Sequence, residues 1–168
     1  AGSVMRVPLV GGTPETMAYT GQEPRGIALN ATAVFWASVN PYAPDTGKVH
    51  RLPIAGEGQP VELASRQYAP AALTLDATHV YWLTGNAVVK SPLDGGAATT
   101  LATAMEMGSR ALAVDDASVY FTVRSTQPLA TDVVSVPKSP SLFTLANALS
   151  SPRIVGADDD FVYWTTHG

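Results

Sequence analysis

The chain has 168 residues, enough for one domain with a substantial core, and we treat residues 1–168 as a single domain. Its formal net charge of −4 and its ten scattered Lys and Arg residues argue against nucleic acid or an anionic membrane as partner. No apolar run is long enough to predict membrane insertion, and the lack of cysteine excludes disulfides and thiolate metal sites.

Taken in chain order, the sequence predicts short β-strands throughout, because apolar and polar residues alternate with period two and no window sustains helical spacing. Two strands open the chain, three four-strand units follow, and two strands close it. The predicted ranges are 3–8 and 14–18; then 26–30, 33–37, 48–53 and 60–64; then 71–75, 79–83, 87–92 and 98–102; then 110–114, 118–122, 132–137 and 141–146; and finally 152–156 and 160–165.

These units are internal repeats. Aromatic landmarks at Trp36, Trp82, Phe121 and Trp164 are 46, 39 and 43 residues apart, and a period of about 40–45 with four short strands is typical of β-propeller blades. The last unit lacks its third and fourth strands, and the N-terminus supplies that pattern. We therefore predict an all-β propeller of four blades with four antiparallel strands each, closed by strands from both termini.

The predicted closure specifies which strands at the two ends of the chain pair with each other. Blade 4 combines residues 152–168 with residues 1–19, residues 161–165 pair with 2–8, and Trp164 is buried. Two alternatives stay open: a segment of a six- to eight-bladed ring, and half of an eight-bladed ring completed by a second chain. The chain is accordingly expected to be a monomer, or a dimer in the last case.

The repeat units also carry a family resemblance. Segments such as ALTLDATHVYWLT followed by VVKSPLDGG resemble the YWTD-like β-propeller repeats, especially the "VYWT…VPLDGG" variant common in predicted secreted bacterial proteins. The match covers essentially the whole chain. The Asp that closes the family motif is missing, since the copies read FWAS, YWLT, YFTV and YWTT. The resemblance implies a bacterial, secreted protein with an extracellular or periplasmic location.

Acidic turns recur at one position of each unit, at Asn30, Asp76, Asp115 and Asp158. Carboxylates placed around a ring can bind Ca²⁺. The simpler interpretation is an Asx turn in each unit, whose side chain accepts backbone N–H groups. We favour the turn interpretation, expect no metal and no cofactor, and note residues 158–160 as the place where a cation should be tested.

The repeated aromatic pairs and the histidines have structural interpretations as well. Neighbouring residues of a strand point to opposite faces, so the pairs are expected to pack between blades rather than to form carbohydrate platforms. His50, His79 and His167 fall at three different strand positions, whereas a metal site needs converging ligands.

The predicted function lies in the connections between strands. Segments 38–47 and 123–132 are expected to form long loops on one face of the propeller, and loops longer than the scaffold needs often bind ligands. We expect a non-catalytic module that binds a protein or a glycan. The alternative is a propeller-type lyase or hydrolase with a site over the central channel. The candidate ligand-binding residues are Tyr42, Asp45, Arg124, Gln127, Tyr68 and Arg66.

Overall fold

The computed structural model describes residues 2–55, 58–103, 107–124, 131–138, 143–150, 152–158 and 160–166, and the regular secondary structure of these residues is entirely β-strand. No helix in this part of the chain has the length and apolar character needed to cross a lipid bilayer. The strands are β1 (Ser3–Arg6), β2 (Glu15–Tyr19), β3 (Glu23–Leu29), β4 (Ala33–Asn40), β5 (Ala43–Pro53), β6 (Val61–Gln67), β7 (Leu73–Leu75), β8 (His79–Leu83), β9 (Ala87–Pro92), β10 (Thr99–Thr103), β11 (Met107–Val114), β12 (Ser118–Arg124), β13 (Thr131–Pro137), β14 (Phe143–Leu149), β15 (Arg153–Ala157) and β16 (Val162–Thr165).

The strands form antiparallel sheets that correspond to propeller blades. Blade 1 has the order β3-β4-β5-β6, blade 2 β7-β8-β9-β10 and blade 3 β11-β12-β13-β14. Two two-stranded sheets, β1-β2 and β15-β16, contain the strand types of a fourth blade. The predicted all-β architecture of four-stranded antiparallel blades is confirmed.

Turn chemistry sets the register of the blades. The Gly-Gly pairs at 11–12 and 95–96 both have positive φ, near 90° and then near 140°, and each follows the proline of a third strand. Gly11 and Gly95 donate their N–H groups to the carbonyls of Pro8 and Pro92, at 2.9 and 3.1 Å. Positive φ is accessible to glycine without steric cost, so the same turn recurs between the third and fourth strands.

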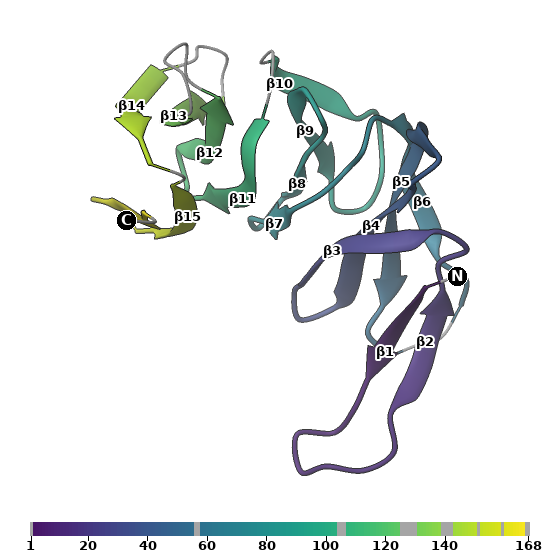
Figure 1. The fold of residues 1–168 in the computed structure, drawn as a ribbon. Helices are drawn as coiled ribbons and strands as arrows, with labels where there is room; N and C mark the ends of the chain where they lie inside the picture. The colour runs from purple at the N-terminus through teal and green to yellow at the C-terminus, as the bar shows by residue number, and fades with distance from the viewer. Residues whose placement is uncertain are drawn as a thin grey trace.

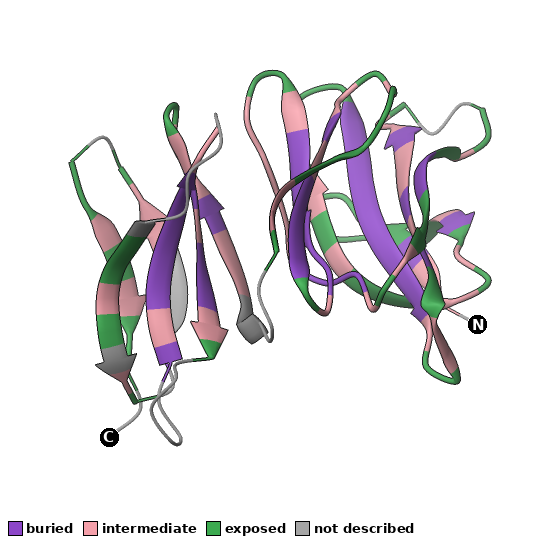
Figure 2. Cartoon of the chain, turned by 90° about the horizontal axis from the view of Figure 1, so that it is seen from above, coloured by how far each residue is buried: buried purple, intermediate pink, exposed green. Residues whose placement is uncertain are grey.

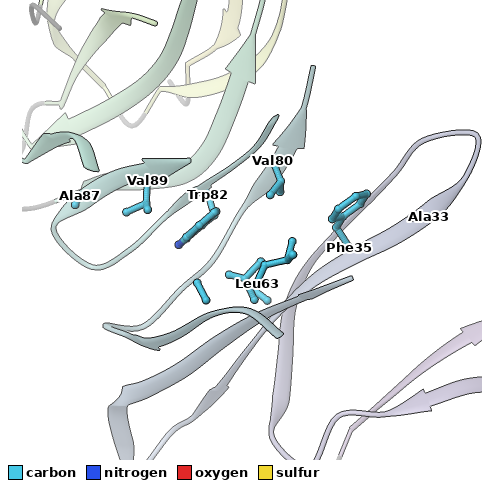
Figure 3. Packing of buried hydrophobic residues seen from close by; sticks show 10 residues of the cluster. Ala33, Phe35, Leu63, Val80, Trp82, Ala87 and Val89 are labelled. Carbon is cyan, nitrogen blue, oxygen red and sulfur yellow. The ribbon is translucent and has the colours of Figure 1, made fainter. Parts of the chain in front are cut away.

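The core lies between blades rather than within one. One cluster joins Phe35 and Val49 of blade 1 to Val80 and Trp82 of blade 2 (Figure 3). The strands at the middle of each sheet carry most of the buried residues (Figure 2), because both of their faces are covered. Packing of aromatic and β-branched residues across these interfaces provides the main stabilisation of the fold. The predicted core role of the aromatic pairs is confirmed in blades 1 and 2.

The blades follow one another along an open arc (Figure 1). The first strands of successive blades, β3, β7, β11 and β15, contact one another and lie on the inner side. Strands β1 and β15 lie toward opposite ends of the arc. The predicted pairing of 161–165 with 2–8 is not among the strand pairings of the described residues: β16 pairs with β15, and β1 pairs with β2. Trp164, predicted to be buried, is half-buried against blade 3.

Candidate functional site: the hairpin face

One end of the blades carries the tight hairpins between second and third strands together with the crossing from one blade to the next. The crossing between β6 and β7 is hydrogen-bonded to the hairpins on both sides. Ala69 N–H donates to the Pro44 carbonyl of blade 1 at 2.7 Å, and Gly85 N–H of blade 2 donates to the Tyr68 carbonyl at 2.7 Å. We call this end the hairpin face.

Tyr42 is the most prominent side chain of this face. Segment 38–47 was expected to be a long loop, but β4 continues to Asn40 and β5 begins at Ala43, which pair with each other. Only Pro41 and Tyr42 remain in the connection, because the strands extend beyond their counterparts in blade 2. The Asn40 carboxamide accepts the Tyr42 N–H at 3.0 Å and holds the turn. Tyr42 is 96% exposed at its tip.

Two hollows flank this hairpin, and Pro41 lines both. The larger one, about 410 Å³, lies toward the N-terminal strands. The smaller one, about 140 Å³, lies toward the crossing to blade 2. Prolines and short side chains form most of the walls, so little reordering is needed to cover them. The larger hollow is lined by Gly2, Gly21, Gln22, Glu23, Pro24, Asn40, Pro41 and Tyr42, and the smaller by Arg25, Val39, Pro41, Pro44, Ala69 and Pro70.

Gln22, which lines the larger hollow, forms hydrogen bonds with residues of blade 1. Its amide nitrogen donates to the Thr46 carbonyl at 3.2 Å, and its amide oxygen accepts the Ser38 hydroxyl at 3.2 Å. The Thr46 hydroxyl in turn donates to the Ala43 carbonyl at 2.7 Å. These bonds fix the base of the hairpin that carries Tyr42, so the exposed ring stands on an ordered support.

The other predicted residues of blades 1 and 2 lie around the same crossing. Asp45 is exposed on β5, three residues beyond the hairpin tip. Arg66 has a φ of 53°, at an irregularity where the register of β6 against β5 shifts, as in a β-bulge. Tyr68 lies over Gly85, where a Cβ atom would come within 2.4 Å of its ring.

The structure does not bring all the predicted residues together. Arg124 ends β12, opposite Thr131 in blade 3, two blades away from Tyr42. Gln127 lies outside the described residues, as does most of the predicted loop 123–132. Sequence reasoning also missed Gln22 and the prolines at 24, 41, 44 and 70. Their clustering around aromatic residues in the connecting segments was the available signal.

The opposite end of the blades carries the acidic turns, and these are Asx turns. In each turn one side-chain oxygen accepts the backbone N–H groups two and three residues later, at 2.7–3.0 Å. Among the described residues no cluster of three or more His, Cys, Asp and Glu could hold a metal ion. Asp159 of the candidate segment 158–160 lies outside those residues.

The second oxygen of each aspartate binds a tyrosine. Asp76, Asp115 and Asp158 accept the hydroxyls of tyrosines five residues later, at 2.6, 2.6 and 2.8 Å. In blade 1 both partners differ together: Asn30 replaces the aspartate and Phe35 replaces the tyrosine. The paired change leaves no orphan hydroxyl, which would be costly to bury. The acidic turn is therefore part of the blade scaffold.

Lys138 adds a contact between blades. Its ammonium lies 2.6 Å from Oδ2 of Asp76 and 5.6 Å from the ring centroid of Tyr81. Burial acts to raise the pKa of Asp76, but hydrogen bonds from Lys138, Tyr81 and two backbone N–H groups outweigh it and hold that pKa well below its usual value. Burial and the Asp76 hydrogen bond raise the pKa of Tyr81. The charges of Asp76 and Lys138 are paired with each other, so this group has a structural role in joining blades 2 and 3.

The two described histidines do not converge. His50 stacks on Trp36 with a centroid distance of 5.3 Å, and burial lowers its pKa. His79 lies at the opposite end of its blade from the hairpin face, where its Nδ1 is 2.8 Å from the Thr78 hydroxyl. Within the described part of the chain, neither side chain forms an ion pair or hydrogen bond with a carboxylate. His167 lies outside that part.

Comparison with known proteins gives the class of the fold. No family model matches the chain, and no curated protein matches it. Solved structures do: a chain of the nidogen/laminin complex matches with a TM-score of 0.69 and 16% identity, over 92% of this chain and 62% of that one. Virginiamycin B lyase from Staphylococcus aureus matches with a TM-score of 0.67 and 14% identity, over 94% of this chain and 54% of that one.

Both neighbours are β-propellers, and the chain has the β-propeller fold. At these identities the likeness concerns the fold alone. The chain spans about three fifths and about half of the lengths of these two neighbours.

Proposed function

We propose that the chain is a non-catalytic binding module whose hairpin face engages a protein. The observation that carries this proposal is Tyr42, exposed at the tip of an ordered two-residue connection between two hollows. Tyrosine is enriched among residues that dominate binding energy, because its rigid ring buries a large area at low entropic cost.

The chemistry of the surrounding surface favours a protein ligand over a glycan. The walls of both hollows are rich in proline and carry single charges, Glu23 and Arg25, which form an ion pair at 3.0 Å. A surface that mixes prolines and an aromatic ring with polar groups matches the composition of protein interfaces. Tyr68, next to the crossing, adds a second aromatic group.

The lyase or hydrolase alternative requires an acid or base held by a partner in a cleft. In the described residues neither histidine side chain forms a hydrogen bond or ion pair with a carboxylate, and the Asp76–Tyr81–Lys138 group is internally paired. The proposal therefore assigns no catalytic residues. The proposal also includes three expectations from the repeats: bacterial origin, secretion and membership of the YWTD-like family. The nidogen/laminin neighbour gives a precedent for protein binding by this fold.

The test is selection of ligands from a random-peptide display library, in parallel with a glycan array. We expect peptides whose affinity falls at least about tenfold with Tyr42→Ala, the effect of losing a central aromatic anchor. Leu9→Ala is the matched control, since Leu9 is fully exposed at the tip of the β1–β2 hairpin, away from the hairpin face. Peptides insensitive to Tyr42→Ala, or binding to glycans alone, would contradict the proposal.

A further inference from the structure

A further hollow lies at the junction of blades 2 and 3, at the end of the blades opposite the hairpin face. Its volume of about 350 Å³ is in the range of small-molecule sites, and the blades on both sides of it are complete four-stranded sheets. We call it the junction hollow. The Asp76–Tyr81–Lys138 group forms part of its lining. The other polar side chains come from Thr78, His79 and Lys90 of blade 2 and Asp116 of blade 3.

The neighbouring junction, between blades 1 and 2, has uncharged residues at the positions of Asp76 and Lys138. Leu93 of blade 2 is the equivalent of Lys138 of blade 3, because the N–H of each donates to the carbonyl two residues after the acidic-turn residue of its own blade, at 3.0 and 2.9 Å. Leu93 packs against the apolar cluster between blades 1 and 2. The turn residue of that junction is Asn30. The fold therefore does not require a charged pair at this place.

Lys90 is the cation of the junction hollow that has no carboxylate partner in the described part of the chain. It lies opposite Tyr81 in the pairing of β8 and β9, so its half-buried side chain is on the face of blade 2 that meets blade 3. Within the described residues its ammonium donates one hydrogen bond, to the Lys138 carbonyl at 3.5 Å. An ammonium has three donors, so most of this capacity is left for another acceptor.

The sheet of β1 and β2 shows how the fold can balance a cation at this position. Arg6 lies two residues before the third-strand proline, as Lys90 does, and donates to the Ile54 carbonyl at 2.9 Å. It also forms an ion pair at 2.9 Å with Glu15, which lies opposite it on the neighbouring strand. The residue opposite Lys90 on its neighbouring strand is Thr99. The strand beside Lys90 thus offers no carboxylate at this position, and the charge of Lys90 is available to an anion.

His79 presents a hydrogen-bond acceptor to the same hollow. The Thr78 hydroxyl lies 2.9 Å from Oδ1 of Asp76 and 2.8 Å from Nδ1 of His79. A carboxylate can only accept, so the hydroxyl donates to Asp76 and accepts the N–H at Nδ1. In the neutral imidazole Nε2 then carries the lone pair, and within the described part of the chain this atom forms no hydrogen bond. The ring is therefore oriented to accept an O–H or N–H group.

The two groups lie on one face of blade 2. His79 is two residues before Tyr81 on β8, so its side chain is on the same side of the sheet as Tyr81 and Lys90. Diagonal neighbours across a strand pair are about 7–8 Å apart, a separation that a small molecule and the flexible lysine side chain can bridge together.

We propose that the junction hollow binds a small acid whose carboxylate pairs with Lys90 and whose adjacent O–H or N–H group donates to Nε2 of His79. The single unbalanced lysine matches a singly charged carboxylate better than a doubly charged phosphate. Asp116, exposed on the turn of blade 3 beside the hollow, also acts against a second negative charge. The carboxylate can belong to a free hydroxy acid or to an acidic side chain of a protein, since both carry this chemistry.

The first experiment titrates the isotope-labelled full chain at neutral pH and follows its amide signals by NMR. The probes are lactate for a free hydroxy acid, N-acetyl-aspartate N-methylamide for an acidic side chain, and inorganic phosphate for comparison. We expect saturable shifts centred on Thr78, His79 and Lys90 with at least one carboxylate, and weaker binding of phosphate. The carboxylate that binds more tightly identifies the source. Shifts that do not saturate, that centre elsewhere, or that are strongest with phosphate would overturn the proposal.

Two lysine variants separate a specific site from a general charge effect. Lys90→Met removes the ammonium and keeps the apolar stem, so it should weaken carboxylate binding at least about tenfold. Lys48→Met makes the same change of net charge on β5 of blade 1, where Lys48 forms an exposed ion pair with Glu62, and should leave the affinity unchanged. An equal loss in both variants would overturn the proposal.

His79→Phe and Asp116→Asn test the other two groups. His79→Phe should weaken lactate binding about three- to tenfold but leave acetate, which has no donor beside its carboxylate, unchanged. Asp116→Asn removes a negative charge at an exposed position and should strengthen the binding of both acids about twofold. Equal effects of His79→Phe on the two acids, or weaker binding by Asp116→Asn, would contradict the assignment. Tyr42→Ala should leave acid binding unchanged, so this test does not depend on whether the hairpin face binds a peptide.

Discussion

Tyr81 and Tyr163 occupy the same position in two different regions of the molecule. Both donate their hydroxyl to an aspartate five residues earlier, at 2.6 and 2.8 Å. Tyr81, in a complete blade, is fully buried, whereas Tyr163, in the C-terminal half-blade, is 51% exposed. The blade itself provides the hydrogen bond, and the following blade provides the burial. Stabilisation by the repeated residues therefore depends on neighbouring blades, as expected of stacked repeats.

The largest expected effect contrasts the two tryptophans of these regions. Trp82→Ala should lower the free energy of unfolding by about 3–5 kcal/mol, because a fully buried ring is lost from the interface of blades 1 and 2. Trp164→Ala should cost clearly less, because Trp164 is only half-buried. Urea unfolding of the two variants checks this. Equal losses would show that the half-blade is as well packed as the interior.

A leucine pair provides a second contrast on the fourth strands. Leu63→Ala should cost about 2–5 kcal/mol, since Leu63 is 93% buried by the following blade, whereas Leu145→Ala should cost less than about 1 kcal/mol. Thermal and urea unfolding measure both.

The aspartate–tyrosine pair can be tested by imitating blade 1. Asp115→Asn and Tyr120→Phe each break a 2.6 Å hydrogen bond and should each destabilise by about 1 kcal/mol. The double variant reproduces Asn30 and Phe35, so it should cost less than the two single changes combined. The same cycle at Asp158 and Tyr163 should show weaker coupling, because that pair is exposed to solvent. Strict additivity at Asp115 would show that the pair does not act as a unit.

The smallest expected effect concerns pH. Burial acts to raise the pKa of Asp115, but hydrogen bonds from Tyr120 and two backbone N–H groups outweigh it, so the pKa lies below its usual value. A carboxyl with a lowered pKa in the folded state stabilises the fold above its unfolded pKa, near 3.9, and this contribution is lost as the pH falls further. The wild-type chain should therefore lose stability below about pH 4, and the double variant at Asp115 and Tyr120 should lose less. Identical pH profiles would contradict this assignment.

The sequence determined the repeating unit. Period-two alternation, the Gly-Gly turns and the acidic turns act within a few residues, so the strands, their order in each blade and the Asx turns could be predicted from local patterns. The aromatic pairs indicated the inter-blade core for the same reason: residues next to each other on a strand face opposite sides.

The candidate site was less predictable. Tyr42, Asp45, Arg66 and Tyr68 were singled out because the sequence predicts connections between strands at their positions, although Asp45 lies on β5 and Arg66 on β6. The length of β4 and β5, which reduces a predicted loop to two residues, depends on pairing between Asn40 and Ala43 that no local pattern specifies. The hollows arise where prolines from three connections meet, which only the packing of blades decides.

The ends of the arc mark the limit of sequence reasoning. Counting repeats predicts that the N-terminal strands complete the last blade, but in the structure β1 pairs with β2 and β16 pairs with β15. Whether β16 meets β1 of its own chain depends on the inclination between blades, which is the summed result of side-chain packing at every interface. Local patterns determined what each strand can pair with, and the tertiary structure decided which strand lies within reach.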